Sequence, residues 1–161
     1  MMQLFAQIEQ SDISIWVRES LWAFPTLLVA HAISMGIVAG GGMMLALRAL
    51  GVAQGVPYRA LGQFAPLMGW GGLIASVSGG LLLAGYPAKA LTNPVFALKF
   101  VFLAAAISLG RFVWTRSQAE HGRAGRSAGT RWAAGLSVLM WVGVIAAGRF
   151  LAYTHRLLLV S

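Results

Sequence analysis

The chain contains four long apolar stretches, and these constrain its fold more than any other feature. They run over about residues 21–50, 61–86, 94–115 and 132–158. A helix needs about 20 residues to cross the ~30 Å hydrocarbon core of a bilayer, so each stretch is long enough to span it. Charged residues make up 10% of the chain, against roughly 25% in an ordinary soluble domain. We therefore expect an all-α integral membrane protein.

The four stretches leave room for short connections alone in a chain of 161 residues. The sequence therefore predicts a single domain over residues 1–161, folded as a four-helix transmembrane bundle. Its first 20 residues predict a short amphipathic or irregular segment. They carry Glu9, Asp12 and Glu19 against Arg18 and lack the basic start of a cleaved signal peptide. We expect the first span to be retained.

The formal charge of +8 does not indicate a nucleic-acid partner, because the positive residues collect at predicted helix ends and in one loop, where a bilayer explains them. Short cytoplasmic loops are enriched in Lys and Arg. This favours both termini on the same, periplasmic side of a bacterial inner membrane. In this orientation the loop between the first two spans and the loop between the last two spans are cytoplasmic. They hold Arg48, Arg59, Arg116, Arg123, Arg126 and Arg131, whereas the opposite side holds Arg18, Lys89 and Arg156.

Local signals support individual spans. Asn93 followed by Pro94 predicts a helix start, with Asn93 as the N-cap. Small residues recur in the first two spans and predict close helix packing; they include Gly36, Gly40, Gly72, Ser76, Gly79 and Gly80. The chain has no cysteine, which excludes disulfides, thiolate metal sites and c-type haem attachment.

Four ionisable residues lie inside the predicted spans: His31, Lys99, Arg149 and His155. Ionisable groups in lipid are costly and mark functional sites by default. His31 lies about ten residues, or about 15 Å, into the first span. Its helical neighbours are apolar except for Ser34. A neutral imidazole there can ligate a metal through one nitrogen, or steady the bundle by a hydrogen bond between helices.

The other three residues extend this candidate site. Lys99 lies near the start of the third span, where a cation is disfavoured by the helix dipole. It either snorkels outward or faces an anionic partner. Arg149 and His155 lie towards the end of the fourth span. With the predicted topology, these residues and His31 fall in the same half of the membrane.

Haem b would satisfy this set of residues. It needs one or two histidine ligands from facing helices and cations for its propionates. His31 and His155 are the candidate metal ligands, and Lys99 and Arg149 are the candidate propionate partners. A single-histidine haem is the alternative, because His155 lies nearer the surface.

Several short segments resemble those of a family of small bacterial four-span inner-membrane proteins. The resemblance covers about residues 13–115. More distantly, the layout resembles the CopD and HemJ-type membrane proteins, which share a histidine in the first span and a lysine at the start of the third. The resemblance is carried by Trp16-Val17-Arg18-Glu19-Ser20, Trp22, Pro25, His31, Leu47-Arg48-Ala49-Leu50-Gly51 and Asn93-Pro94-Val95-Phe96-Ala97-Leu98-Lys99. HemJ-type proteins bind haem b and oxidise protoporphyrinogen, so the resemblance implies porphyrin or haem handling around His31 and Lys99.

These observations predict a haem b-binding membrane protein for electron transfer, with a quinone and a partner membrane subunit as candidate partners. HemJ-like porphyrinogen oxidation is one alternative. A second is a non-catalytic subunit or homo-oligomer in which the embedded charges specify helix pairing. Copper handling by His31 with Met35, Met43 and Met44 is the third, since thioethers suit Cu(I), but adjacent Met43 and Met44 face different directions on a helix.

Overall fold

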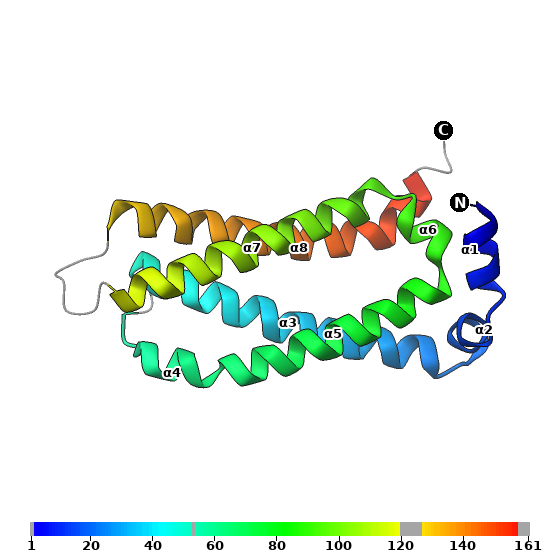
Figure 1. The fold of residues 1–161 in the computed structure, drawn as a ribbon, viewed down its shortest axis with the longest axis horizontal. Helices are drawn as coiled ribbons and strands as arrows, with labels where there is room; N and C mark the ends of the chain where they lie inside the picture. Colours follow the sequence, from blue (N-terminus) through cyan, green and yellow to red (C-terminus); the bar gives the residue numbers. More distant parts are fainter. Residues whose placement is uncertain (1, 53, 120–126, 158–161) are drawn as a thin grey trace. The chain divides into compact units, whose positions relative to one another are not determined.

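The computed structural model describes residues 2–52, 54–119 and 127–157 (Figure 1), and within these its regular structure is helical throughout, without a strand. Four helical segments are long and apolar enough to cross a membrane. They are α3 (Ala23–Leu50), α4 with α5 (Tyr58–Gly85), α7 (Pro94–Ala119) and the first part of α8 (Ala128–Leu151 of Ala128–Leu157). The all-α membrane fold is confirmed, and the chain is a multi-pass membrane protein.

The helix boundaries follow the predicted spans closely. The helix α7 begins at Pro94, as predicted, and continues to Ala119, four residues beyond the predicted end of its span. The helix α8 begins at Ala128, four residues before the predicted start. These extra turns are polar or carry arginine, so the apolar pattern alone does not reveal them.

The second span is interrupted, which the apolar pattern did not predict. The helix α4 (Tyr58–Gln63) ends before Phe64, and α5 (Ala65–Gly85) begins directly after it. Pro66 has no backbone N–H to donate to the preceding turn, and its ring crowds the carbonyl four residues back. The last turn of α4 is therefore tighter than an α-helical turn: the Phe64 N–H donates to the Leu61 carbonyl, three residues back, at 3.1 Å.

The N-terminal segment forms two short helices, α1 (Met2–Glu9) and α2 (Asp12–Glu19). Ser11 caps α2, because its hydroxyl accepts from the Ser14 N–H at 3.3 Å. One face of α2 is buried through Ser14 and Val17, whereas Trp16 is exposed. This segment is therefore amphipathic and helical, which agrees with the first of the two predicted forms.

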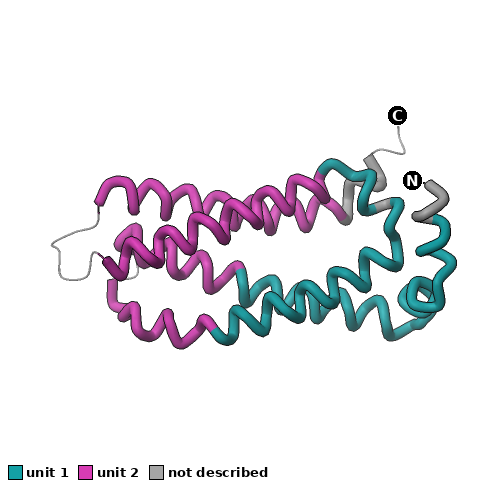
Figure 2. Tube along the Cα trace, in the orientation of Figure 1, with its two compact units in different colours: residues 1–38, 66–94 teal, residues 39–65, 95–161 magenta. Residues whose placement is uncertain are grey.

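The chain divides into two compact units (Figure 2). Unit 1 comprises residues 1–38 and 66–94, and unit 2 comprises residues 39–65 and 95–161. Unit 1 holds α1, α2, the first part of α3, α5 and α6 (Pro87–Leu91). Unit 2 holds the rest of α3 with α4, α7 and α8. The single-domain organisation stays a prediction.

Small buried residues form the core of unit 2. Ala46, Ala49, Val113 and Ala134 are almost fully buried, and Leu45, Leu50, Ala133 and Val138 pack against them. Small side chains let helix backbones approach closely where lipid surrounds the bundle. Large apolar side chains such as Trp70 and Leu139 remain 65% and 63% exposed, which indicates contact with the bilayer.

Candidate functional site around His31

His31 lies on α3 in unit 1, and its imidazole is turned towards α5 of the same unit. The Nδ1 atom lies 3.0 Å from the Ala75 carbonyl oxygen and 3.2 Å from the Ser78 hydroxyl. Both partners belong to α5, and the ring is half-buried. The hydrogen bond between helices, the alternative to a ligand role, is therefore present, and the ligand role of His31 stays a prediction.

These contacts determine which ring nitrogen carries the proton. A carbonyl oxygen is an acceptor alone, so Nδ1–H must donate to Ala75. The Ser78 hydroxyl donates its own proton to the Ile74 carbonyl at 2.6 Å and therefore presents a lone pair to Nδ1. In the neutral imidazole Nε2 then carries no proton and presents its lone pair. This is the tautomer in which a histidine can coordinate a metal through Nε2.

Gly79 allows the ring to lie against α5. A methyl group at Gly79 would lie 2.9 Å from Cε1 and 3.2 Å from Nδ1 of His31, closer than packed carbon atoms approach. At the next position, Gly80, a methyl group would have no neighbour within 4 Å. The sequence predicted both glycines as helix-packing residues, and the structure assigns the imidazole contact to Gly79.

The hydroxyl that contacts the imidazole nitrogen comes from Ser78 and not from Ser34, the polar neighbour of His31 on its own helix. Ser34 donates to the Ala30 carbonyl at 2.7 Å and to the His31 carbonyl at 3.1 Å, so its hydroxyl bonds to its own helix. Ser78 of α5 supplies the hydroxyl at Nδ1. Its signal in the sequence is a spacing of three and four residues among Gly71, Ala75 and Ser78, all buried on one face of α5.

Lys99 and Arg149 lie in unit 2. Lys99 is half-buried on α7. A methyl group at Gly148 would lie 3.9 Å from Cε and 4.0 Å from Nζ of Lys99, so the side chain of Lys99 passes close to α8. Arg149 follows Gly148 and is exposed. The sequence has no Asp or Glu between residues 20 and 119, so an acidic partner for Lys99 does not come from that segment.

The second candidate ligand, His155, lies on α8, but its side chain is outside the described residues. Pairing of His31 with His155 therefore stays a prediction. So does the use of one cofactor by His31 together with Lys99 and Arg149, since they belong to different units. In the described part of the chain, no three His, Cys, Asp or Glu residues gather to hold a metal ion.

Comparison of the chain with protein-family models, with curated proteins and with solved structures finds no match. The resemblance to the four-span bacterial family and to CopD and HemJ-type proteins therefore stays a prediction carried by short segments.

Proposed function

We propose that this protein is a haem b-binding integral membrane protein that transfers electrons, with a quinone and a partner membrane subunit as its redox partners. The observation that carries the proposal is the position of His31. Its Nδ1 faces two acceptors on α5, the Ala75 carbonyl and the Ser78 hydroxyl. Histidines that ligate metals commonly donate their other N–H to such an acceptor, which fixes the tautomer and raises the basicity of the ligating nitrogen.

Of the residues in the described site, His31 fits the role of a ligand to haem iron. His31 would coordinate through Nε2, while Ala75 and Ser78 hold the ring against rotation and Gly79 sets its distance from α5. Bound haem b would supply a one-electron redox couple. His155 would be the candidate for a second iron ligand, and Lys99 and Arg149 would be the candidate cations for the propionates.

The test is a reduced-minus-oxidised absorption spectrum with a pyridine haemochrome assay on detergent-purified protein. We expect a b-type spectrum in the wild type and its loss in His31→Ala. A colourless wild type after haem-replete expression would overturn the proposal. Free porphyrin in the preparation would favour porphyrinogen oxidation instead.

Ser78→Ala gives a graded version of this test. It removes one acceptor from Nδ1 and keeps the ligand, so we expect the b-type spectrum to persist with haem affinity lowered about tenfold, the lower end of measured outer-shell effects. Ser76→Ala is the matched control, because Ser76 is exposed and bonds to Gly72 of its own helix at 2.8 Å. Equal haem affinity in the two variants would contradict the positioning role of Ser78.

A non-catalytic membrane subunit is the second candidate function. It is favoured by the same hydrogen bonds, because they join α3 to α5 and would stabilise that helix pair without any cofactor. In this case the wild type is colourless, His31→Ala lowers thermal stability, and a partner that co-purifies is lost when Lys99 or Arg149 is changed. Spectrum and partner analysis on the same preparations separate the two functions.

A further inference from the structure

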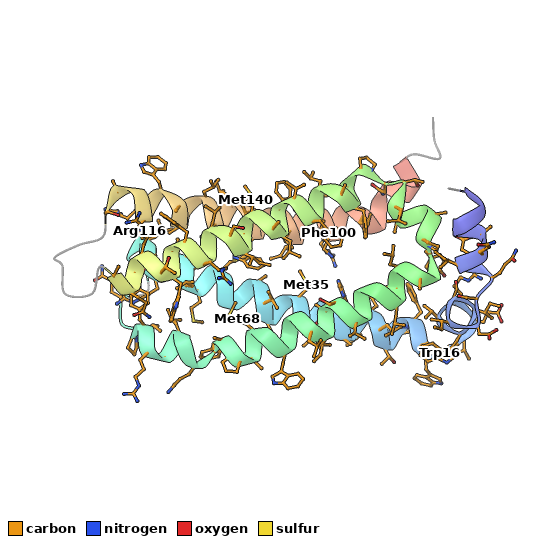
Figure 3. All side chains as sticks on the ribbon, viewed as in Figure 1. Trp16, Met35, Met68, Phe100, Arg116 and Met140 are labelled. Atoms are coloured by element: carbon orange, nitrogen blue, oxygen red, sulfur yellow. The ribbon has the colours of Figure 1, made fainter. Side chains whose placement is uncertain are left out.

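One end of unit 2 carries arginines at the ends of four helices. Arg48 lies in the last turn of α3, Arg59 in the first turn of α4, and Arg116 in the last turn of α7. Arg131 lies in the first turn of α8. Figure 2 shows these helix ends gathered at one end of the unit, and Figure 3 labels Arg116 there. We call Arg48, Arg59, Arg116 and Arg131 the arginine end.

The arginine end has few carboxylates to balance it. The four acidic residues of the chain are Glu9, Asp12, Glu19 and Glu120, so three of them precede residue 20. The fourth lies outside the described residues. Neither residues 20–119 nor α8 contain an Asp or Glu, so an anion from outside the chain can pair with these arginines.

Arg48 is held by a hydrogen bond and by a ring contact. Its Nε donates to the Val56 carbonyl at 2.6 Å, and its guanidinium carbon lies 4.9 Å from the centre of the Tyr58 ring. Tyr58 is buried and packs edge-on against Trp114, with ring centres 6.5 Å apart. The backbone turns back after α3 at Gly51, whose φ is 93°. The guanidinium is therefore held in place by protein groups that leave its charge unneutralised.

The level of Arg48 along the span identifies the anion. The 28 residues of α3 extend about 42 Å at 1.5 Å per residue, which exceeds the ~30 Å hydrocarbon core. With the span centred in the bilayer, the last turn of α3 reaches the depth of lipid headgroups. Guanidinium groups match the geometry of phosphate oxygens and bind them by charge-assisted hydrogen bonds.

We propose that the arginine end binds the phosphate of an anionic phospholipid, with Arg48 as its fixed ligand and Arg59 as a second, exposed one. An anionic lipid is favoured over a zwitterionic one because a headgroup with net negative charge gains from each nearby arginine, whereas the choline of a zwitterionic lipid is repelled. This interaction is independent of haem.

Native mass spectrometry of the delipidated, detergent-purified full chain tests this proposal. Dioleoyl phosphatidylglycerol and dioleoyl phosphatidylcholine are titrated separately. We expect tighter binding of phosphatidylglycerol to the wild type. Arg48→Gln and Arg59→Gln should each lower its affinity about fivefold, the effect of one arginine near the surface. Neither variant should change the affinity for phosphatidylcholine.

Arg18→Gln is the matched control, because Arg18 is exposed in unit 1 and its guanidinium donates to the Glu9 carbonyl. It should leave phosphatidylglycerol binding unchanged. Arg59→Gln keeps the test decisive if Arg48→Gln fails to fold, since the side chain of Arg59 is exposed. Equal binding of the two lipids, equal losses in the Arg18 and Arg59 variants, or displacement of phosphatidylglycerol by equimolar inorganic phosphate would each overturn the proposal.

Discussion

At the scale of single residues, the position of His31 depends on the size of its neighbours as well as on its hydrogen bonds. Side-chain hydrogen bonds between membrane helices contribute about 0.6 kcal/mol on average. That is too little to hold a half-buried imidazole in one place against thermal motion. Gly79 has no side chain, and this leaves the space that the imidazole occupies. A methyl group at Gly79 would lie 2.9 Å from Cε1 of His31.

Gly79→Ala should therefore displace the ring. Overpacking of this kind costs about 1–3 kcal/mol, and the shift would pull Nδ1 away from Ala75 and Ser78. We expect a lower thermal stability and, if haem is bound, an altered or lost b-type spectrum. Gly80→Ala is the control, since a methyl group there has no neighbour within 4 Å. Equal stability and equal spectra in the two variants would show that the ring is not held where the structure places it.

The sequence identified His31 as the candidate ligand but not its partners. A histidine inside a span stands out because of its type, whereas Ser78 and Ala75 look like ordinary small residues of a packing face. Their contact with His31 depends on the rotation of α5 about its axis, which the apolar pattern leaves undetermined because α5 is apolar on every side. For the same reason the spacing along α3 pointed to Ser34 alone as a polar neighbour and gave no sign of Ser78.

At the scale of helices, the pairing of α3 with α8 in unit 2 includes one very close contact besides the alanine core. Trp141 is 2% exposed, and its indole lies over Gly42, where a methyl group would overlap three atoms of the ring. Its Nε1–H has no hydrogen-bond partner in the described structure. A buried donor without an acceptor costs about 1–3 kcal/mol, so packing at Gly42 must compensate for that loss.

Gly42→Ala should be strongly destabilising, because the rigid indole cannot yield as a flexible side chain would. We expect a loss of about 1–3 kcal/mol, measured as a lower melting temperature in detergent. Gly40→Ala, where a methyl group meets nothing within 4 Å, should be close to neutral. Combining Gly42→Ala with Trp141→Phe should recover part of the loss, since the smaller ring makes room. Additive losses in the double variant would contradict direct contact.

The helix boundaries show how far local signals extend. The start of α7 at Pro94 was predictable, because Asn and Pro act on the backbone next to them. The interruption at Phe64 follows from Pro66 by the same kind of local argument, but the apolar run across it concealed the break. The N-terminal helices α1 and α2 are too short to show a clear period, and α2 depends on burial of Val17 against Gly85, a contact 68 residues away in sequence.

At the scale of the whole molecule, the distribution of charge predicts its orientation. Cytoplasmic loops are enriched in Lys and Arg, so the arginine end should face the cytoplasm and the N-terminal segment the opposite side. The cytoplasmic leaflet is also the one that carries a negative surface potential in many membranes, which agrees with the anionic lipid proposed for Arg48.

Single cysteines can test this orientation, because the chain contains none of its own. Gln10→Cys and Gly55→Cys lie at exposed positions outside the four spans, one before α2 and the other between α3 and α4. In intact bacterial cells with a permeable outer membrane, a membrane-impermeant maleimide should label the first variant. It should label the second after the inner membrane is opened. Labelling of Gly55→Cys in intact cells would reverse the orientation and place the arginine end outside. Such a reversal would leave lipid binding by Arg48 testable in detergent, because that interaction depends on the guanidinium and the phosphate, whichever leaflet supplies it.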